Sequence, residues 1–541
     1  MSGEDTGPTA HPTRRLGDLV LRFGGEGRLR GTRLGDRPVA TTDLADVEVT
    51  GVTHDSRVVR PGMLFVAITG QQADGHDFIP AALEAGAAGL IVERQQAGVA
   101  APQVVVDAAR PALASAAAWW YGDPSHALTV VGITGTDGKT TTAYLAVAAL
   151  ESAGRRAAMI GTIATRIGGR TEAHAVHATT PEAPELQAML RAMVDAGDEI
   201  AVIETTSHGL ALDRVASIAY DIAILTNLTH EHLELHGTWE AYRDAKLSLF
   251  DRLRSGRTMM KGHPVTATAI VNLDDPSAGA FIGTARGAGA RVITYGTEPA
   301  ADVRATRITE DAHGLHAAIE TATGAAVLDL RLAGRFNVHN ALAVVALGEA
   351  LGLDGAAVRR GLASLEVVPG RMERIERGQP FGVVVDFAHS PASLRTVLDL
   401  LAPSAAAGGG GVIAVFGSAG ERDTAKRPQM GRIAGERARL VIVTDEDPRG
   451  EDPEVILDAI ARGAETAGRR RGQDLHLIAD RRTAIAAAFD AARPGDIVLL
   501  AGKGHERSII GRDGERTWDE HAVATELLGV LGFTDDPDRP A

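Results

Sequence analysis

The sequence predicts an α/β protein of three domains, in which the second and third domains are parallel sheets covered on both faces by helices. The first observation is the length, because 541 residues correspond to three domains at about 100–200 residues each. The second is the alternation of apolar runs such as "EIAVIE" and "YDIAILTNL" with helical patterns such as "TTAYLAVAALESAG". This alternation is typical of parallel α/β sheets.

The domain boundaries are predicted from breaks rich in Gly, Pro and Asp. Residues 1–14 are expected to be a disordered lead, and the first, small α/β domain, residues 15–126, ends at "YGDPSH". The central domain covers residues 127–367. The third domain, residues 368–541, contains "FGVVVDFAH", "GVIAVFG", "ARLVIVTDE" and "GDIVLLAGKG", which predict a Rossmann-like, doubly wound sheet. The run "AAAGGGG", residues 405–411, is predicted to be a loop.

Composition excludes several classes of protein. The formal net charge is −15, from 55 basic and 70 acidic residues, whereas proteins that bind nucleic acid or anionic membranes usually present a basic face. The chain has no cysteine, which excludes disulfides, thiolate metal sites and cysteine nucleophiles. No apolar run approaches the roughly 20 residues that span a bilayer, and the N-terminus lacks the apolar core of a signal peptide. We therefore expect a cytoplasmic protein that binds no nucleic acid.

A phosphate-binding loop is predicted at "GITGTDGKTTT", residues 132–142, which follows an apolar strand and begins a helix. Glycines let backbone amides point at phosphate oxygens, and the helix N-terminus adds partial positive charge. Lysine reaches the β- and γ-phosphates, and the next threonine offers a hydroxyl to Mg²⁺. Ile133 stands where the strict spacing requires glycine, so this is a variant loop. The expected ATP-binding residues are Gly135, Thr136, Asp137, Gly138, Lys139, Thr140 and Thr141.

Two further strand ends are expected at the same edge of the sheet, since ligands bind at the carboxyl ends of parallel strands. One strand ends at Glu204, and the other is followed by His230 and His232. Glutamate supplies the hard oxygen that Mg²⁺ prefers, although a solvated loop acid would have the same pattern. Two histidines at this spacing also suit zinc, but no third ligand lies nearby in the sequence. A Mg²⁺–nucleotide site accounts better for these residues together with the phosphate loop.

A helix is predicted in "TWEAYRDAKLSLFDRL", residues 238–253, from its apolar spacing. Lys246 falls on the same face as Tyr242, Leu249 and Phe250. From the helix alone, the simpler interpretation is that the lysine stem packs there while its ammonium reaches water. Its position near the predicted nucleotide site suggests instead a buried amine with a chemical role.

Eleven phrases, in this order, are similar to one known family: "DSRVVRPGMLFVAITGQQADGHDFI", "GITGTDGKTTT", "HATTPE", "ETTSHGL", "NLTHEHLELHGTWEAYRDAKLSLF", "GRFNVHNALA", "PGRMER", "VDFAHSP", "ERDTAKRPQMG", "DEDPRGEDP" and "AGKGHE". They resemble the Mur ligases, the ATP-dependent amide-forming enzymes of peptidoglycan precursor synthesis. Within that family the phrases are most similar to ligases that add a diamino acid to UDP-N-acetylmuramoyl-L-Ala-D-Glu (UDP-MurNAc-L-Ala-D-Glu). The resemblance implies a UDP-binding first domain, a central P-loop ATPase domain and a third domain that binds the amino acid.

The resemblance also implies the chemistry. ATP would phosphorylate the D-Glu carboxylate to an acyl phosphate, which the incoming amine attacks with release of phosphate. Lys139, Thr140, Glu204 and His232 would hold the phosphates and Mg²⁺. Lys246 matches the family lysine that carries a carbamate formed with CO₂, which converts an ammonium into an oxygen ligand suited to Mg²⁺. Burial favours this conversion because it disfavours the charged ammonium.

Substrate contacts are implied by the same match. Ser56 would lie at the uridine end, where its residue type alone indicates only a turn or cap. Four residues match positions that contact the muramoyl dipeptide: Thr179, Thr180, Thr206 and Arg214. Five match positions around ATP: Asn337 and Asn340 near adenine and ribose, and Arg371, Asp386 and His389 from the third domain. Leu212, Asp137 and Ala178 depart from the usual pattern, which leaves the finer substrate contacts open.

The diamino acid is predicted from "EDPR", residues 446–449. Family members that add meso-diaminopimelate typically carry Asp-Asn-Pro-Arg, and Arg449 can pair with the distal carboxylate that lysine lacks. The added negative charge of Asp447 would instead suit lysine or ornithine. We expect diaminopimelate, bound by Arg422, Glu446, Asp447, Arg449, Gly502 and Glu506.

Two other functions are compatible with parts of this pattern. A folylpolyglutamate synthase uses the same acyl-phosphate chemistry, but the first domain with Ser56 and the "EDPR" phrase argue against it. A catalytically silent nucleotide-binding scaffold would not need Lys139, Glu204, His232 and Lys246 together. We expect the chain to act as a monomer on ATP, UDP-MurNAc-L-Ala-D-Glu and a free diamino acid.

Overall fold

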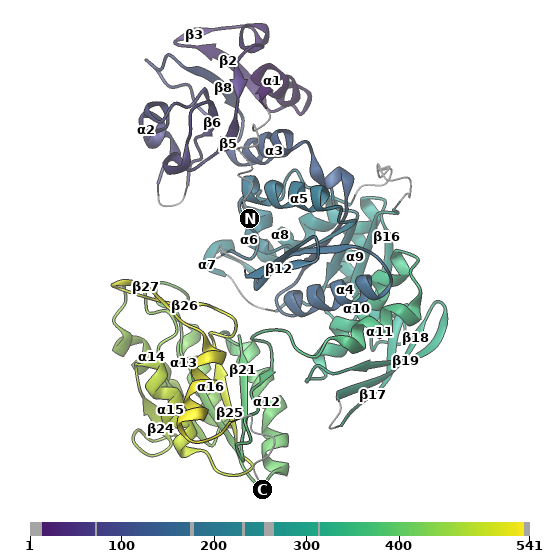
Figure 1. The fold of residues 1–541 in the computed structure, drawn as a ribbon, viewed down its shortest axis with the longest axis vertical. Helices are drawn as coiled ribbons and strands as arrows, with labels where there is room; N and C mark the ends of the chain where they lie inside the picture. The colour runs from purple at the N-terminus through teal and green to yellow at the C-terminus, as the bar shows by residue number, and fades with distance from the viewer. Residues whose placement is uncertain are drawn as a thin grey trace, which may run out of the picture.

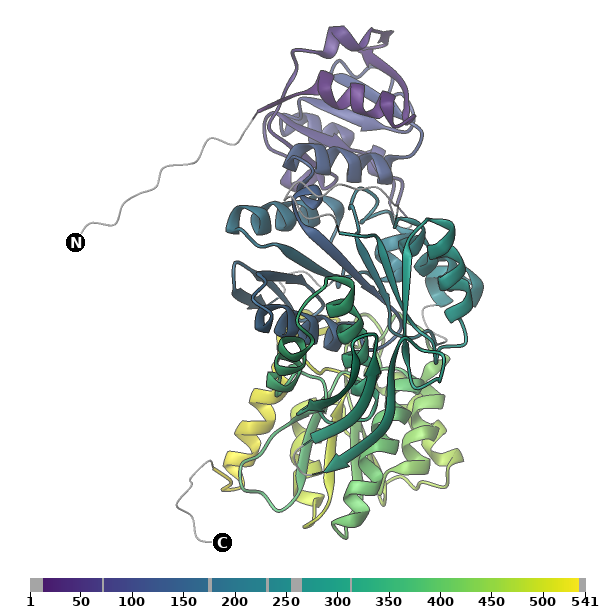
Figure 2. The ribbon, with the colours of Figure 1, turned by 90° about the vertical axis from the view of Figure 1, so that its right-hand side faces the viewer.

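The computed structural model describes residues 13–70, 73–173, 178–229, 233–253, 265–311 and 314–534. Three large sheets follow one another along the chain and lie in a row along the long axis of the molecule (Figures 1 and 2). Each of the three predicted domain ranges contains one of them. In the predicted disordered lead, Arg14 is already part of strand β1 (Arg14–Arg15), which pairs with β4 (Glu48–Val49). The expectation of disorder through residue 14 is therefore wrong at its last residue.

The first sheet has six strands in the order β3-β2-β8-β7-β6-β5. Strands β5 to β8 are parallel, and β2 runs antiparallel to β8. Leu16, Phe23 and Leu64 belong to its apolar core. Its strands and helices are β2 (Leu29–Leu34), β3 (Arg37–Pro38), β5 (Gly51–Thr53), β6 (Met63–Val66), β7 (Gly89–Val92), β8 (Pro102–Val106), α1 (Leu16–Gly25), α2 (Ile79–Glu84) and α3 (Ala109–Tyr121).

The central sheet has eleven strands in the order β12-β11-β10-β13-β9-β14-β15-β16-β17-β18-β19. Strands β10, β13, β9, β14, β15, β16 and β17 are parallel, and antiparallel strands extend both edges. The strands are β9 (Thr129–Thr134), β10 (Ala157–Ile160), β11 (Ala164–Ile167), β12 (Arg170–Ala173), β13 (Ile200–Glu204), β14 (Ile222–Leu225), β15 (Thr268–Asn272), β16 (Arg291–Gly296), β17 (Val303–Asp311), β18 (Gly314–Thr321) and β19 (Gly324–Leu330).

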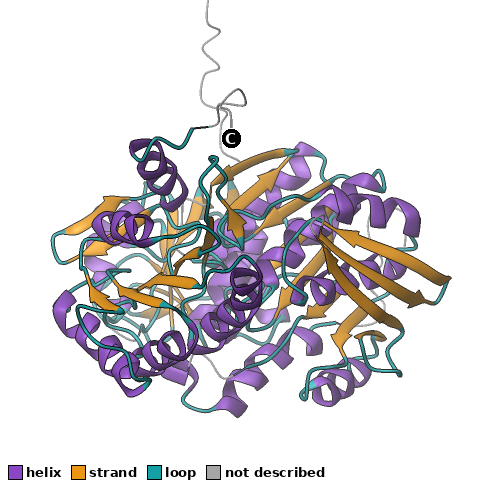
Figure 3. Ribbon diagram, turned by 90° about the horizontal axis from the view of Figure 1, so that it is seen from below, coloured by secondary structure: helices purple, strands orange, loops and turns teal. Residues whose placement is uncertain are grey.

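Helices cover both faces of this sheet, and Figure 3 shows the helices (purple) and strands (orange) of the molecule from below. Val130 packs in one layer and Val131 in the other, because successive side chains of a strand point to opposite faces. Helices α4 (Lys139–Ser152), α10 (Phe336–Ala350) and α11 (Gly355–Ser364) form one layer. Helices α5 (Ala183–Ala196), α8 (Trp239–Asp251) and α9 (Ala278–Gly287) form the other. The two shorter helices are α6 (Ser207–Ala211) and α7 (Leu233–His236).

The third sheet has the order β20-β21-β25-β22-β23-β24, with β20 antiparallel and the others parallel. The four predicted apolar runs contain β21 (Gly382–Asp386), β22 (Val412–Phe416), β23 (Leu440–Val443) and β25 (Ile497–Ala501). The other elements are β20 (Glu373–Arg374), β24 (Leu475–Leu477), β26 (Ser508–Gly511), β27 (Gly514–Thr517), α12 (Pro391–Ala407), α13 (Lys426–Arg437), α14 (Pro453–Thr466), α15 (Arg481–Ala491) and α16 (Glu520–Val530).

Helix α12 corrects the predicted loop at residues 405–411, because it continues through Ala407 and ends at Gly408. Alanine is the best helix former, so only the glycines after Ala407 leave the helix. In the part of the chain that the structure describes, no helix combines the length and the apolar character needed to cross a membrane.

Candidate active site

The predicted phosphate loop lies between β9 and α4. Gly135 and Gly138 have φ angles of 149° and 84°, in the region that favours glycine. The Thr226 hydroxyl, just beyond β14, donates to the Asp137 carbonyl at 2.6 Å, and the Asp137 amide donates to Asn227 Oδ1 at 3.0 Å. The loop is therefore held against the neighbouring strand end, with the α4 N-terminus behind it.

Two lysines converge on one carbonyl of this loop. Lys139 Nζ donates to the carbonyls of Gly135 and Thr136 at 3.0 and 2.7 Å. Lys246 Nζ donates to the same Gly135 carbonyl at 2.8 Å and lies 4.6 Å from the Tyr242 ring centroid. Lys246 is 1% exposed, so its amine does not reach water, and the simpler interpretation drawn from the helix alone is wrong.

Glu204 ends β13 and is fully buried. Its Oε2 accepts hydrogen bonds from the hydroxyls of Thr140 at 2.8 Å and Thr162 at 3.0 Å. Its Oε1 accepts from the Thr162 amide at 2.9 Å. A solvated loop acid would show none of these contacts, so the prediction that Glu204 belongs to the phosphate-loop site is supported by its position beside Thr140.

The donors gathered here fit a Mg²⁺–nucleotide complex. Buried carboxylate and hydroxyl oxygens are hard ligands, and glycine backbone at a helix N-terminus leaves room for phosphate. His230 and His232 lie outside the described residues. Among the residues that are described, no group of three or more His, Asp or Glu side chains is arranged to hold a metal ion.

Substituting Gly135 with alanine should disable this loop. An added Cβ would collide with the Thr226 hydroxyl and the Asn227 carbonyl, and alanine rarely adopts this φ. We expect kcat/KM for the nucleotide to fall by about 100-fold, since displacements near 1 Å have effects of this size. Gly154→Ala is the matched control: Gly154 follows the same helix, also has positive φ, and would meet no atom within 4 Å. Equal kinetics for the two variants would contradict this prediction.

The predicted dipeptide residues gather beside Glu204. The Thr180 hydroxyl donates to the Glu204 carbonyl at 2.9 Å and lies 3.0 Å from the Thr206 hydroxyl. Arg214 donates to the Thr180 carbonyl at 2.9 Å and pairs with Glu182 at 2.7 Å. These residues therefore form one polar cluster that adjoins the phosphate-loop site.

The remaining predicted residues for the dipeptide and the uridine are Thr179 and Ser56. The Thr179 hydroxyl lies 3.0 Å from the Thr162 hydroxyl, whose own proton is donated to Glu204. Ser56 begins a short 3₁₀ helix, η2 (Ser56–Val58), capped by Asp55. The adjacent His54 acts on Glu185 of α5, whose pKa is raised by burial against the opposing effect of that histidine. His54 of this segment therefore lies within electrostatic range of α5, the helix that follows Thr179 and Thr180.

Asn337 and Asn340 are buried on α10 against the phosphate loop. The Thr142 hydroxyl donates to Asn340 Oδ1 at 3.3 Å, and Asn340 donates to Asn337 Oδ1 at 2.9 Å. A Cβ at Gly138 would collide with Asn340 Oδ1. The two asparagines support the turn into α4, and a contact with adenine or ribose stays a prediction.

The third sheet reaches the phosphate loop through Arg371. Its guanidinium lies 3.5 Å from the Thr140 hydroxyl and 4.6 Å from the Phe387 ring centroid. Asp386 accepts from the amides of Met372 and Ala388, both at 2.8 Å. Burial raises the pKa of Asp386, while the Arg371 charge opposes this rise. The carboxyl edge of β21 therefore faces the loop of the central sheet.

His389 lies in the same segment as Asp386. Its ring centroid is 4.6 Å from that of Phe387, and its carbonyl accepts from Lys426 Nζ at 2.9 Å. Phe387 also packs against His505, at 4.9 Å between centroids. Burial and neighbouring cations lower the pKa of His505 to about 3, so this imidazole is neutral at pH 7.

Two loops at the carboxyl edge of the third sheet carry most of the predicted amino-acid residues. We call residues 445–449, after β23, the first loop and residues 502–506, after β25, the second loop. Lys503 of the second loop is fully buried and donates to Asp447 Oδ1 of the first at 2.9 Å. Asp447 Oδ1 also accepts from the Ile510 amide at 2.9 Å, and Lys503 Nζ lies 2.5 Å from Glu506 Oε2. Burial raises the pKa of Glu506, and the positive charge of Lys503 opposes this rise.

Several buried polar atoms of these loops have no protein partner among the described residues. They are Glu446 Oε2, Arg449 Nε, Asp445 Oδ1, His505 Nδ1 and Ser418 Oγ, the last in the adjoining loop after β22. Native proteins rarely leave such groups unpaired. Arg449 also adopts a positive φ of 54°, a strained conformation that concentrates at ligand sites. These observations favour a polar ligand between the loops.

Arg422 and Gly502 complete the predicted amino-acid residues. A Cβ on Gly502 would approach Glu446 Oε2 to 3.2 Å. Arg422 is exposed in the loop after β22, which is tied to the first loop because the Gly420 amide donates to the Asp447 carbonyl at 2.8 Å. The structure therefore places the six predicted residues in three adjacent loops.

Stability should depend on the charge of Asp445. Burial raises its pKa to about 6, although Arg516 and Arg481 oppose the rise. Between pH 4 and 6, roughly, the unfolded chain loses this proton while the folded chain keeps it, so unfolding becomes easier as pH rises. We expect Asp445→Asn to stabilise the protein by about 1 kcal/mol at pH 7.5, after allowance for solvent screening, and by almost nothing at pH 4. Thermal melts at both pH values check this, and a gain confined to pH 4 would contradict it.

Two residues of the site were missed from the sequence. Thr162 binds Glu204 through both its amide and its hydroxyl, and it follows the end of β10, so the strand-end rule applied to Glu204 also points to it. Lys503 lies within the quoted phrase "AGKGHE", but its buried contact with Asp447 depends on a loop 56 residues earlier.

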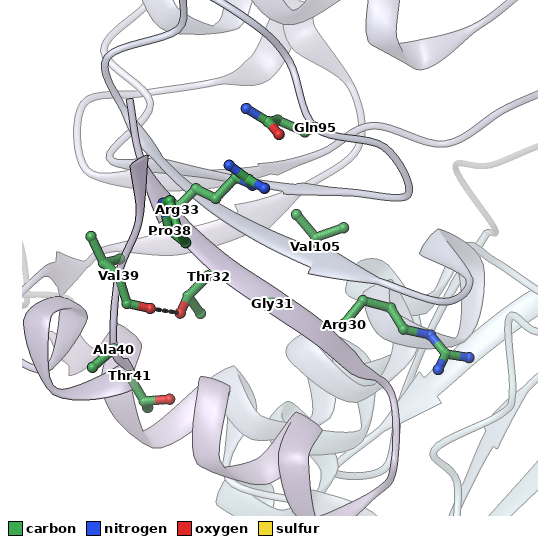
Figure 4. A pocket seen from close by; sticks show the side chains of 10 residues that line it. All are labelled: Arg30, Gly31, Thr32, Arg33, Pro38, Val39, Ala40, Thr41, Gln95 and Val105. Atoms are coloured by element: carbon green, nitrogen blue, oxygen red, sulfur yellow. Dashed lines mark hydrogen bonds between the residues drawn. The ribbon is translucent and has the colours of Figure 1, made fainter. Parts of the chain in front are cut away.

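A surface hollow of about 440 Å³ lies elsewhere, on the first sheet (Figure 4). Arg30, Arg33 and Gln95 are among its lining residues, and the Thr32 hydroxyl donates to the Val39 carbonyl at 2.7 Å within it. None of the predicted site residues lines it.

Family models and similar proteins both cover most of this chain and point to one family. Residues 48–121 match the Mur ligase family catalytic domain, residues 133–348 the Mur ligase middle domain, and residues 370–504 the Mur ligase glutamate ligase domain. UDP-N-acetylmuramyl-tripeptide synthetase of Roseiflexus sp. (strain RS-1) is 48% identical over 493 residues, or 90% of this chain and 96% of that protein. UDP-N-acetylmuramoyl-L-alanyl-D-glutamate–2,6-diaminopimelate ligase of Solibacter usitatus (strain Ellin6076) is 41% identical over 92% of this chain and 97% of that protein.

Solved structures give the same result. One of a UDP-N-acetylmuramoyl-L-alanyl-D-glutamate–2,6-diaminopimelate ligase is 31% identical, with a TM-score of 0.61, covering 91% of this chain and 97% of that one. Mycobacterium tuberculosis folylpolyglutamate synthase is 19% identical, with a TM-score of 0.57 over 72% and 91%, which shows a shared fold alone. A phosphate loop facing a second α/β sheet, in a chain with these relatives, defines an ATP-dependent ligase. The chain belongs to the Mur ligase family.

Proposed function

We propose that this ligase joins meso-diaminopimelate to UDP-MurNAc-L-Ala-D-Glu, with conversion of ATP to ADP and phosphate. The observation that carries the proposal is the contact between Arg371 and Thr140. Through it, the edge of the third sheet that carries the polar loops adjoins the phosphate loop of the central sheet. The name of the Solibacter usitatus relative supports the choice of substrates. The peptide bond would form between these two sheets.

The reaction balances in two steps. An oxygen of the D-Glu carboxylate attacks the γ-phosphorus of ATP, and the bond to the β–γ bridging oxygen breaks, releasing ADP. The amine nitrogen then attacks the acyl carbon, phosphate leaves with the C–O bond electrons, and the nitrogen gives up its proton to solvent. Lys139 and the α4 N-terminus would stabilise the charge on the transferring phosphoryl group. Mg²⁺, when bound, supplies further neutralisation of that charge and would be held by Thr140, Glu204, His232 and carbamylated Lys246.

Carbamylation of Lys246 is supported by its neighbour. Lys139 and Lys246 donate to one carbonyl oxygen, so two ammonium groups would lie close together in a buried site, where like charges disfavour each other. Addition of CO₂ to the Lys246 amine forms an N–C bond and releases a proton, and the resulting carbamate is negative. The pair then becomes attractive, and the carbamate oxygens suit Mg²⁺.

The dipeptide would bind along Thr179, Thr180, Thr206 and Arg214. Their cluster adjoins Glu204, so a D-Glu carboxylate bound there lies near the phosphate loop. Arg214 already pairs with Glu182, and a substrate carboxylate would share or replace that partner. The uridine would extend toward Ser56.

The third sheet favours diaminopimelate over lysine. The negative charge of Asp447 is taken up by buried Lys503 and the Ile510 amide, so it is not free to attract a second ammonium group. Arg449 keeps a buried Nε without a protein partner among the described residues. A distal carboxylate would satisfy that guanidinium, which a lysine side chain cannot do.

An ADP-release assay tests this function. The full-length protein is supplied with ATP, Mg²⁺ and UDP-MurNAc-L-Ala-D-Glu, and diaminopimelate, lysine and ornithine are added in turn. We expect ADP release to depend on the nucleotide dipeptide and to be fastest with diaminopimelate. Faster release with lysine or ornithine would change the amino acid, whereas release that depends on a folate would overturn the proposed function.

A further inference from the structure

Arg481 is the largest of the fully buried side chains in the part of the chain that the structure describes. It begins α15 and pairs with Glu520, the first residue of α16, and both side chains are 0% exposed. The guanidinium binds this carboxylate at two points, Nη2 to Oε1 at 2.7 Å and Nε to Oε2 at 2.9 Å. Trp518 Nε1 donates to Glu520 Oε2 at 2.6 Å. Glu520 is therefore fixed from two sides.

The remaining guanidinium donors reach two backbone carbonyls. Nη1 donates to the Asp445 carbonyl at 3.0 Å, and Nη2 donates to the Ala501 carbonyl at 2.8 Å. Asp445 begins the first loop, and Ala501 is the residue before the second loop. The two strands involved, β23 and β25, are not neighbours, because β22 lies between them. Arg481 thus bridges loops that no sheet hydrogen bond joins directly.

Stability alone is a poor reason for this arrangement. Removing two charges from water is costly, and well-packed apolar residues in place of a buried ion pair are often as stabilising or more so. A planar guanidinium, however, holds its donors in a rigid fork. The fork sets the distance and angle between the two carbonyls that it binds.

We infer that Arg481 and Glu520 are positioning residues for the diamino acid, because they fix the spacing of the first and second loops. This inference rests on the proposed function, which places the amino acid between those loops. Glu446, Asp447 and Arg449 lie on one side and Gly502 and Glu506 on the other. If the loops shifted relative to each other, Arg449, which would hold the distal carboxylate, would move away from Gly502 and Glu506 on the other side of the substrate.

The test is a double variant, Arg481→Met with Glu520→Gln, which removes both charges together and leaves an acceptor for Trp518. A single Arg481→Met would strand a buried carboxylate. We expect KM for the amino acid to rise about tenfold or more, while KM for ATP stays within about twofold and kcat changes less than KM. Arg481→Lys should give a smaller rise, since one ammonium cannot replace the fork.

The adjacent residue provides the matched control. Arg482 of α15 also pairs with a glutamate of α16, Glu526, at 2.8 Å, but the side chains are 40% and 61% exposed and the pair reaches neither loop. Arg482→Met with Glu526→Gln should leave both KM values unchanged. Thermal melts of all variants show whether each is folded.

The outcomes separate the inference from the function on which it rests. The wild-type protein is assayed first, and the amine that it uses fastest is used for every variant. A wild type without amine-dependent ADP release would overturn the function and the inference together. With an active wild type, a folded double variant with unchanged KM for the amine would overturn the inference alone. Equal rises in KM for the amine and KM for ATP would show a merely structural role and would also overturn the inference. If the double variant does not fold, the ratio of these two KM changes in Arg481→Lys decides instead.

Discussion

Replacing Lys246 with alanine should lower kcat by about 100-fold or more, the largest effect we expect from a single side chain. The amine is buried against the Gly135 carbonyl, beside Lys139. As a carbamate it would supply negative oxygens to the nucleotide site, and alanine supplies none. The measurement is ADP release with saturating substrates.

Chemical rescue makes this prediction specific. Short carboxylates such as acetate should restore part of the activity of Lys246→Ala, because a free carboxylate can occupy the space of the lost carbamate. Arg243→Ala is the matched control on the same helix, since Arg243 stacks on Trp239 and pairs with Asp244; it should keep wild-type activity. Full activity in Lys246→Ala would rule out the carbamate, and so would absence of label on Lys246 after incubation with isotope-labelled bicarbonate.

Replacing Arg449 with alanine should raise KM for diaminopimelate by about 100-fold and leave KM for ATP within about twofold. A hydrogen bond to a charged group contributes about 1.5–3 kcal/mol, and a bidentate pair makes two such bonds. The backbone of the loop should persist, because the Arg449 amide still donates to the Ile510 carbonyl, at 2.9 Å. Initial rates at varied amino acid and varied ATP give the two constants.

Lysine as a competing substrate sharpens the Arg449 test. It has no distal carboxylate, so Arg449→Ala should narrow the preference for diaminopimelate over lysine. Arg512→Ala serves as control, because Arg512 donates to the Gly450 carbonyl from the exposed turn of the β26–β27 hairpin. A parallel loss of affinity for ATP and diaminopimelate would contradict the assignment of Arg449 to the distal carboxylate.

Elements with a strong local pattern could be predicted from the sequence. The third-domain runs contain β21, β22, β23 and β25, and the helix around Lys246 begins after Thr238, whose hydroxyl caps it. Alanines 405–407 belong to helix α12, although the glycines that follow them predict a loop over the whole segment. The family could be predicted as well, since eleven ordered phrases are independent matches.

Contacts between segments that are distant in sequence could not be predicted in the same way. Lys246 meets a carbonyl 111 residues earlier, and Arg371 meets a hydroxyl 231 residues earlier. Sequence periodicity places a side chain on a face of its own element, but it does not say which strand packs beside that face. In the sequence, Arg481 is only a charged residue at the start of a helix, and nothing nearby indicates that its guanidinium is buried.

The sequence by itself determined the α/β class, the phosphate loop, the strand-end glutamate and a lysine on an apolar helix face. Each of these features depends on residues within a few positions of one another, where the periodicity of a helix or a strand can be recognised in the sequence. Only the tertiary structure decided that Lys139 and Lys246 share a carbonyl, that Lys503 neutralises Asp447, and that Arg481 bridges two loops. These pairings depend on the order of strands in the sheets, which brings residues far apart in the chain to one edge.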